Sequence, residues 1–556
     1  GDIDGAYDAF FKATWNAAWQ DSGYMGLAQI DMIREDYTNG LDHIDRSLYR
    51  NWLNHKGRQL KVSFLRKTGD FAKAEALIND SLAMDKFNMG CRFESYLIHT
   101  LQGNTEAAAA AKAEMKALMR GAVHSYLEYA IDYASAGMYE EAAQLLSFVT
   151  EENEATYPMV YYALGYFASK MGKKDEALNL YKKAETMCPD YCFPNKLEEV
   201  LMLNDAMSLN PEGAKAPYYL GNFHYAARIY DEAIACWEKS ASIDDTYPTV
   251  LRNLSLAYYN KQHNPQKALA TLEKAYNLDT TDARILMELD QLYKKLRYPH
   301  RQRLDFLEAH ADVVEQRDDL CIERITLYNQ LGEYQKAYDL INSRKFHPWE
   351  GGEGKVTSQY LLCRVELAKI AIREGRFADA VRLLKETEKY PDNLGEGKLS
   401  MAEENDIHYW MGCAYEGLGE EALAKEYFTK ATKGSAEPAI AFFYNDQQPD
   451  KIFYQGLAWR KLGEEDKARS RFNRLIKHGE KHLFDKVKID YFAVSLPDLL
   501  IWDDDLNVRN QIHCNLVMGM GYLGLGDKEQ ARKFLSEVAR LDINHQAGKQ
   551  LLEMCG

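Results

Sequence analysis

The sequence predicts an all-helical solenoid in which helical hairpins stack one after another. Three observations predict this fold class. A small residue recurs every 34 positions in the first part of the chain, a series of turn positions recurs in step with it, and apolar residues follow at helical spacing. At 556 residues the chain also exceeds the length that one globular core usually organises, whereas a repeat array can grow by adding units.

The two series of recurring residues predict where each hairpin turns and where its helices touch. The small residues are Ala6, Gly40, Ala74, Ala108 and Ala142, and the series five positions earlier is Gly1, Glu35, Gly69, Gly103 and Gly137. Glycine adopts a left-handed backbone at little cost, so we expect the earlier series to lie in the turns. The later series then marks the point where the second helix approaches its partner closely.

Apolar residues continue the pattern on the second helix of each hairpin. Ile78 and Ser81 stand four and seven positions after Ala74, and Leu146 and Val149 stand at the same distances from Ala142. This spacing forms one stripe along a helix. Each hairpin therefore has an apolar face that it cannot bury alone, and stacking on the next hairpin buries it.

Several later segments resemble the tetratricopeptide repeat. The pattern residues are Leu164, Gly165, Gly172, Ala177, Tyr181, Ala184 and Pro189, then Gly412, Tyr415, Gly419, Ala424, Phe428 and Ala431, then Gly456, Trp459, Gly463, Ala468 and Phe472, and finally Gly519, Tyr522, Gly526, Ala531 and Leu535. The resemblance implies a right-handed α-α superhelical solenoid, and we count about fourteen units in it.

Changes in the repeat spacing divide the chain into three stretches. Residues 1–190 form a regular array whose first unit is truncated, because Gly1 already stands at a turn position. Residues 191–345 contain divergent units with an extra helix expected near 194–209, where the step between contact points lengthens to 56. Residues 346–556 contain units with long inserted loops, and a short helix is expected to cap the C-terminus.

Composition and motifs exclude several classes of function. The net charge of −16 repels nucleic-acid phosphates and anionic lipid, so we expect neither as a partner. The sequence contains no apolar run of membrane-helix length, and we expect a cytoplasmic location. The nine cysteines are scattered, and the closely spaced Cys188 and Cys192 have no second pair to complete a metal site. Nucleophile elbows, phosphate loops and zinc-helix motifs are absent from the sequence. We therefore expect no metal, no cofactor and no enzyme activity.

The resemblance to the tetratricopeptide repeat implies which side chains line an inner groove. Positions 2, 5, 9 and 12 of each unit face that groove in the family, and they give the binding candidates Tyr162, Tyr166, Tyr218, Asn222, Tyr225, Tyr409, Phe453 and Arg460. Tyrosine offers large contact area with a polar tip, which suits a peptide, a helix or a sugar chain. The alternative is that several of these rings pack between neighbouring helices. The favoured function is a scaffold that binds another protein.

The inserted loops carry a second group of candidate residues. They are His347, Trp349, Glu350, Glu353, Glu396, Trp502, Asp503 and Asp504. An aromatic platform beside carboxylates is typical of a sugar-binding or acid–base site. The alternative is structural: glycine and proline enforce the turns, tryptophan covers apolar surface and acidic residues cap helices.

The loops also carry a more specific resemblance. The segments FHPWEGGEG, NLGEG, IFYQGLAWRKLGE and DYFAVSLPDLLIWDDDL are similar to the repeat region of an uncharacterised bacterial family. Longer members of that family carry an N-terminal β-rich, mutarotase-like domain, which implies a carbohydrate-related role and a partner domain on the same chain. Clustering of loops 346–354 and 391–397 on the inner face would favour this second hypothesis, and separation on the outer face would favour the protein scaffold.

Overall fold

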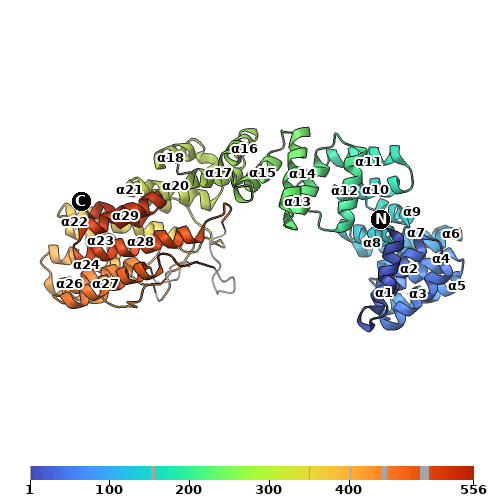
Figure 1. The fold of residues 1–556 in the computed structure, drawn as a ribbon, viewed down its shortest axis with the longest axis horizontal. Helices are drawn as coiled ribbons and strands as arrows, with labels where there is room; N and C mark the ends of the chain where they lie inside the picture. The colour runs from blue at the N-terminus through green and yellow to red at the C-terminus, as the bar shows by residue number, and fades with distance from the viewer. Residues whose placement is uncertain (1, 152–156, 350, 401, 440–447, 489–499) are drawn as a thin grey trace. The chain divides into compact units, whose positions relative to one another are not determined.

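The computed structural model describes residues 2–151, 157–349, 351–400, 402–439, 448–488 and 500–556. These residues form α-helices and two 3-10 helices, and no strand occurs among them. The chain divides into two compact units, residues 1–250 and residues 251–556. Figure 1 shows the helices in chain order along both units.

Unit 1 (residues 1–250) consists of successive helical pairs. Its helices are α1 (Ile3–Ala13), α2 (Gln20–Ile33), α3 (Tyr37–Arg50), α4 (His55–Lys67), α5 (Phe71–Met84), α6 (Met89–Leu101), α7 (Thr105–Met119), α8 (Val123–Ser135), α9 (Tyr139–Ser147), α10 (Met159–Lys170), α11 (Lys174–Thr186), α12 (Leu197–Leu209), α13 (Lys215–Ala226) and α14 (Tyr230–Ile243), with the 3-10 helix η1 (Ala17–Trp19) before α2. Helices α2 and α3 pack as a hairpin, as do the pairs α4–α5 to α10–α11 and the pair α13–α14. Helix α12 packs between α10 and α13.

Unit 2 (residues 251–556) continues the same arrangement. Its helices are α15 (Pro248–Asn260, which begins at the boundary), α16 (Pro265–Leu278), α17 (Ala283–Lys295), α18 (His300–Ala309), α19 (Ala311–Val314), α20 (Asp318–Gln330), α21 (Tyr334–Asn342), α22 (Lys355–Arg373), α23 (Phe377–Lys385), α24 (Asn405–Gly417), α25 (Glu421–Ala431), α26 (Pro449–Lys461), α27 (Glu465–His482), α28 (Leu506–Leu525), α29 (Lys528–Leu541) and α30 (Gln546–Met554), with η2 (Asp392–Leu394) between α23 and α24. Helix α30 packs on α29 at the end of the chain.

The recurring residues have the structural roles that the solenoid requires. Gly69, Gly103 and Gly137 adopt φ values of 76°, 73° and 76° in the hairpin turns, and Glu35 takes the same left-handed backbone at 57°. At Gly40 an added Cβ would clash with the ring of Phe64 on the next hairpin. The small residues therefore let neighbouring helices approach, and the predicted stack of helical hairpins is confirmed.

A buried ionic network joins three consecutive hairpins of unit 1. The guanidinium of Arg66 on α4 donates to the carboxylate of Glu94 on α6 at 2.6 Å and to that of Glu141 on α9 at 3.1 Å. The hydroxyl of Tyr133 on α8 also donates to Glu94, at 2.9 Å. Because each charge has a partner, the network fixes the register between hairpins without leaving an unpaired charge in the core.

The end of unit 2 docks onto its first helices through a tryptophan. Trp502, which precedes α28, is 1% exposed, and its indole N–H donates to the backbone carbonyl of Glu288 on α17 at 3.0 Å. Its ring meets Tyr259 of α15 edge-on, with ring centroids 5.2 Å apart. Asn260 adds two hydrogen bonds to the same segment, accepting from the N–H of Asp503 and donating to the carbonyl of Ile501.

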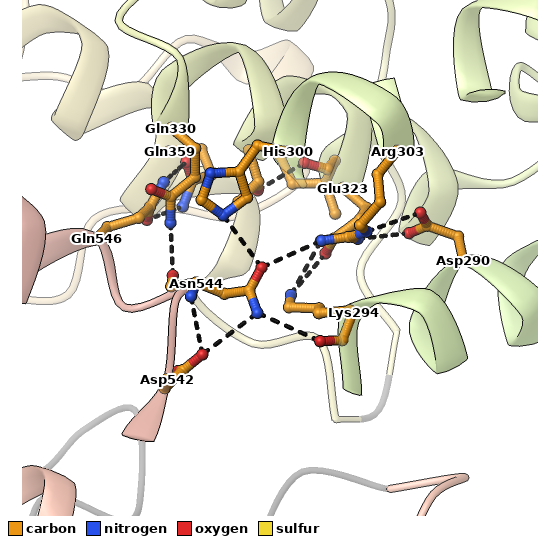
Figure 2. A network of polar contacts seen from close by, with 12 residues as sticks. Asp290, Lys294, His300, Arg303, Glu323, Gln330, Gln359, Asp542, Asn544 and Gln546 are labelled. Atoms are coloured by element: carbon orange, nitrogen blue, oxygen red, sulfur yellow. Dashed lines mark hydrogen bonds and ion pairs between the residues drawn. The ribbon is translucent and has the colours of Figure 1, made fainter. Parts of the chain in front are cut away.

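A second contact between the ends of unit 2 runs through the turn between α29 and α30. Figure 2 shows Asn544 of this turn among side chains of α17, α18 and α20. Its side chain accepts from Arg303 at 3.3 Å and lies 3.2 Å from the ring nitrogen of His300. Gln546 exchanges hydrogen bonds with Gln359 of α22 at 2.9–3.0 Å. Residues separated by about two hundred positions in the sequence therefore hold unit 2 together at two places.

We predict that unit 2 loses stability in mild acid because His513 is buried. Burial lowers the pKa of His513 to about 4, and its ring nitrogen lies 2.8 Å from the carbonyl of Ala439. The unfolded chain, with an ordinary pKa near 6.5, binds a proton first as the pH falls, so the free energy of unfolding decreases from about pH 7 down to about pH 4. Urea titrations of the native protein and of His513→Asn between pH 7 and pH 5 measure this effect. The variant should show the shallower dependence, and parallel curves would contradict the assignment.

Candidate functional site

Three of the eight candidate groove residues are buried between helices. Tyr162 of α10, Tyr218 of α13 and Phe453 of α26 have almost no solvent exposure. The hydroxyl of Tyr162 donates to the carboxylate of Glu185 at 2.7 Å, and its ring lies edge-on to Tyr219 of the next hairpin. These three rings contribute to packing in this structure.

Three other candidate rings are partly open to solvent. Tyr166 lies on α10 one turn beyond Tyr162, Tyr225 lies near the end of α13, and Tyr409 lies on α24. The ammonium of Lys170 lies 5.1 Å from the Tyr166 ring, and the Tyr225 ring lies 5.2 Å from that of Trp237. Each ring is therefore partly covered by neighbouring side chains and partly exposed to solvent.

The remaining two candidates are engaged within the protein. The side-chain oxygen of Asn222 accepts a hydrogen bond from the indole of Trp237 at 3.1 Å. The guanidinium of Arg460 pairs with Glu465 at 2.9 Å and donates to the carbonyl of Gly524 at 2.7 Å. Both polar groups hold neighbouring helices in place, and both residues are partly exposed, like the three tyrosines.

The inserted loops 346–354 and 391–397 lie beside one another. The N–H of Phe346 donates to the carbonyl of Asn393 at 2.7 Å, and the carboxylate of Glu396 accepts from the N–H of Gly354 at 3.0 Å. Gly354 is the N-cap of α22, where the backbone N–H groups are free to bind a carboxylate. Burial raises the pKa of Glu396. Its carboxylate caps a helix, and that contact accounts for its position without a ligand.

The other residues of the first loop are placed by local contacts. His347 is largely exposed, and both its backbone N–H and its ring nitrogen lie near the carboxylate of Asp318, at 2.8 and 3.1 Å. Trp349 packs its ring against Gly352, where an added Cβ would clash with the indole. Glu353 is exposed, and Glu350 lies outside the described residues.

The three candidates of the last loop hold the ends of unit 2 together. Trp502 is the buried indole described above, and its only polar atom is occupied by the Glu288 carbonyl. Asp503 lies 3.6 Å from the ammonium of Lys261, and Asp504 pairs with Lys295 of α17. These residues serve internal contacts, and sequence reasoning missed their partners because those partners lie more than two hundred positions away.

The described part of the chain offers little that would assemble a catalytic or metal centre. No group of three or more His, Cys, Asp and Glu side chains comes together there as metal ligands would. The nine cysteines, all within the described residues, are free thiols, and burial raises the pKa of Cys91 and Cys363 to about 12. Such thiols are poor nucleophiles at neutral pH. In the same residues, no helix has both the length and the apolar character that a membrane span requires.

Family models of the tetratricopeptide repeat match three parts of the chain. They cover residues 160–191, 406–433 and 452–478. These ranges contain the hairpins α10–α11, α24–α25 and part of α26–α27, so the matches fall in both units. The remaining hairpins share the architecture.

The chain also matches several solved structures at low identity. MamA is 21% identical over 34% of this chain and 95% of its own, with a TM-score of 0.17. PilF of Pseudomonas aeruginosa is 19% identical over 40% of this chain and 90% of its own, with a TM-score of 0.24. A chain of the APC/C hetero-tetramer Cut9–Hcn1 is 12% identical over 100% of this chain and 99% of its own, with a TM-score of 0.25. At these values the similarity carries no information about function.

Proposed function

We propose that the chain is a non-catalytic scaffold for protein–protein interaction, and that the open tyrosines of its first helices hold a peptide, a helix or an adjoining domain. The observation that carries the proposal is the partial exposure of Tyr166 and Tyr225 on α10 and α13, the first helices of two hairpins in unit 1 between which α12 packs. Large rings that are supported on one face and open on the other are typical of protein-binding surfaces.

The architecture supports this proposal over an enzymatic one. Stacked hairpins present side chains at regular intervals along an extended surface, which matches the regular spacing of a bound peptide or helix. Two of the candidate carboxylates that an acid–base reaction would need, those of Glu396 and Asp504, are occupied by internal contacts. The matches to tetratricopeptide-repeat models agree with a binding role.

The carbohydrate hypothesis gains no support from the paired loops. Their contact is made by a backbone hydrogen bond and by the capping of α22, and Trp349 packs on Gly352. Trp502, which lies in a different segment, is buried. A sugar platform needs an accessible aromatic face beside free carboxylates. The adjoining β-rich domain implied by the resemblance to the bacterial family is one kind of protein partner that fits this proposal.

A displayed library of short random peptides, selected against the whole chain, tests the proposal. Peptides enriched on the native protein should bind the double variant Tyr166→Ser/Tyr225→Ser at least about tenfold more weakly, equivalent to about 1.4 kcal/mol. The matched control is Tyr191→Ser, which removes an exposed tyrosine from a loop of the same unit. Circular dichroism verifies that all three proteins retain their helices.

The control should bind the selected peptides as the native protein does. Two results would contradict the role of these tyrosines. One is that peptides are enriched on the native protein no more than on an unrelated protein, and the other is that the native protein and the double variant bind the enriched peptides with equal affinity.

A further inference from the structure

Large apolar side chains are exposed together at one edge of unit 1. They are Trp15, Trp19, Tyr49, Trp52, Leu53 and Phe87, with 49–85% of each residue open to solvent. All six lie in or next to the connections that lead from one hairpin to the next, namely α1–α2, α3–α4 and α5–α6. We call these six residues the aromatic edge. An exposed set of this kind is unusual on a soluble protein and indicates an interaction surface.

Polar contacts between side chains show that the three connections are neighbours. The side chain of Asn51 in the second connection donates to the carboxylate of Asp21, just after the first, at 3.3 Å. His55, just after the second connection, lies 3.6 Å from the carboxylate of Asp85 and 3.2 Å from the side chain of Asn88 in the third. The aromatic edge is therefore continuous, and adjacent packed helices give it a length of about 20 Å.

The edge includes a shallow hollow of about 380 Å³ between α2 and α3. Its lining includes the rings of Tyr24 and Tyr49 and the guanidinium groups of Arg46 and Arg50. The carboxylate of Asp42, also in the lining, pairs with Arg46 at 2.8 Å, and that of Asp45 pairs with Lys61 at 2.5 Å. The volume is sufficient for a side chain of a partner to enter.

Two cations of the edge lie against aromatic rings instead of carboxylates. The guanidinium of Arg50 lies 5.8 Å from the Tyr49 ring, and the ammonium of Lys86 lies 5.1 Å from the Phe87 ring. Neither forms an ion pair with any residue in the described ranges. The carboxylates of the edge, in contrast, are engaged: Asp21 by Asn51, Asp42 by Arg46 and Asp85 by His55.

We propose that the aromatic edge binds an extended segment of another protein in which apolar or aromatic residues alternate with carboxylates. The exposed rings receive the apolar side chains, and Arg50, which lines the hollow, and Lys86 pair with the carboxylates. An edge of about 20 Å corresponds to about six residues of extended chain. This surface is distinct from the tyrosines of α10 and α13, so it stands independently of the function proposed above.

An anionic membrane would also contact aromatic and basic side chains, but the charge of the protein disfavours it. The whole chain carries a net charge of −16. This net charge repels an extended surface of like sign, whereas a single peptide segment can place its few carboxylates next to the two cations. A protein segment is therefore the favoured partner.

The test uses a fluorescein-labelled peptide of alternating phenylalanine and glutamate and a matched peptide with lysine in place of glutamate, titrated against the whole protein by fluorescence anisotropy. The glutamate peptide should bind the native protein at least about tenfold more tightly than the lysine peptide. The variant Arg50→Glu/Lys86→Glu should reverse this preference. Tyr49→Ser/Phe87→Ser should weaken both peptides at least about tenfold.

The matched control is Phe484→Ser/Arg469→Glu, which changes an exposed ring and an exposed cation of unit 2. It should bind the glutamate peptide like the native protein. The proposal is overturned if neither peptide binds or if the charge-reversed variant keeps the native preference for the glutamate peptide. It is also overturned if vesicles of anionic phospholipid bind through these residues and the peptide does not. Sedimentation that shows two copies of this chain pairing through the edge would overturn it as well. Retained binding by the Tyr166→Ser/Tyr225→Ser variant separates this surface from the groove.

Discussion

Replacement of Trp502 by alanine should destabilise unit 2 by about 3–5 kcal/mol, the usual cost of removing a buried tryptophan side chain. The indole is 1% exposed, packs edge-on against Tyr259 and donates its N–H to the carbonyl of Glu288. The substitution therefore leaves a cavity between the end of unit 2 and its first helices, and it removes the second hydrogen bond to the Glu288 carbonyl. Urea unfolding of the whole chain, followed by hydrogen exchange in peptides of unit 2, measures the loss.

Phe484→Ala is the matched control for this substitution. Phe484 is a large ring of the same unit, but 84% of it is exposed, so its removal should change the stability of unit 2 by less than about 0.5 kcal/mol. Equal effects of Trp502→Ala and Phe484→Ala would show that the indole is not buried as described.

Replacement of Arg303 by methionine should cost about 3–5 kcal/mol, because it leaves a buried charge without its partner. The guanidinium donates to Asp290 at 2.7 and 3.0 Å and to Glu323 at 2.7 Å, and Arg303 and Asp290 are both buried (Figure 2). Methionine fills a similar volume, so the loss reports on charge more than on packing. The stability of unit 2, measured by urea unfolding, is the readout.

Arg301→Met is the control on the same helix. Arg301 pairs with Glu333 at the surface, so its loss should cost no more than about 1 kcal/mol. The double variant Arg303→Met/Asp290→Asn should recover part of the stability, since neither charge remains. If Arg303→Met and Arg301→Met are equally stable, the network in Figure 2 does not hold unit 2 together.

The Arg303→Met variant should also gain stability as the pH falls. Burial raises the pKa of Asp290, and the Arg303 guanidinium opposes this rise. Without the guanidinium, the pKa of Asp290 in the folded state rises further above its value in the unfolded chain. The cost of burying the ionised carboxylate is therefore present above the folded-state pKa and disappears as the pH falls through that pKa. The difference in unfolding free energy between variant and native protein should therefore narrow from pH 7 to pH 5, and a constant difference would contradict the electrostatic origin.

The hairpin stack could be predicted from the sequence because its signals are local. Gly69 and Ala74 lie five residues apart in the sequence. Gly69 forms the hairpin turn, and Ala74 lies where the second helix contacts its partner. The same local signals recur from unit to unit, so one pattern predicts many hairpins. In the first part of the chain, where the 34-residue series holds, the turn positions therefore followed from periodicity.

The contacts between the ends of unit 2 could not be predicted in the same way. Trp502 and Glu288 are 214 positions apart, and Asn544 lies 250 positions from the Lys294 carbonyl that it contacts. No periodic pattern links such residues, because their proximity depends on the summed geometry of all the hairpins between them. The sequence showed an unusual tryptophan followed by acidic residues, and only the structure supplied their partners.

For the candidate groove, the sequence predicted the face of the helix but not the exposure of each ring. Tyr162 and Tyr166 stand one turn apart on α10, yet a ring of the next hairpin, Tyr219, covers the first and leaves the second partly open. Position within a unit gives the face of the helix. Exposure on that face depends on the size of side chains in the neighbouring unit, which varies along the chain.

The docking of the C-terminal segments onto the first helices of unit 2 is tested most directly by hydrogen exchange of the native protein and of Trp502→Ala. Exchange should accelerate in residues 500–510 and also in α15 and α17, more than two hundred positions away, while α2–α5 of unit 1 stay unchanged. Acceleration confined to residues 500–510 would contradict the contact between the two ends.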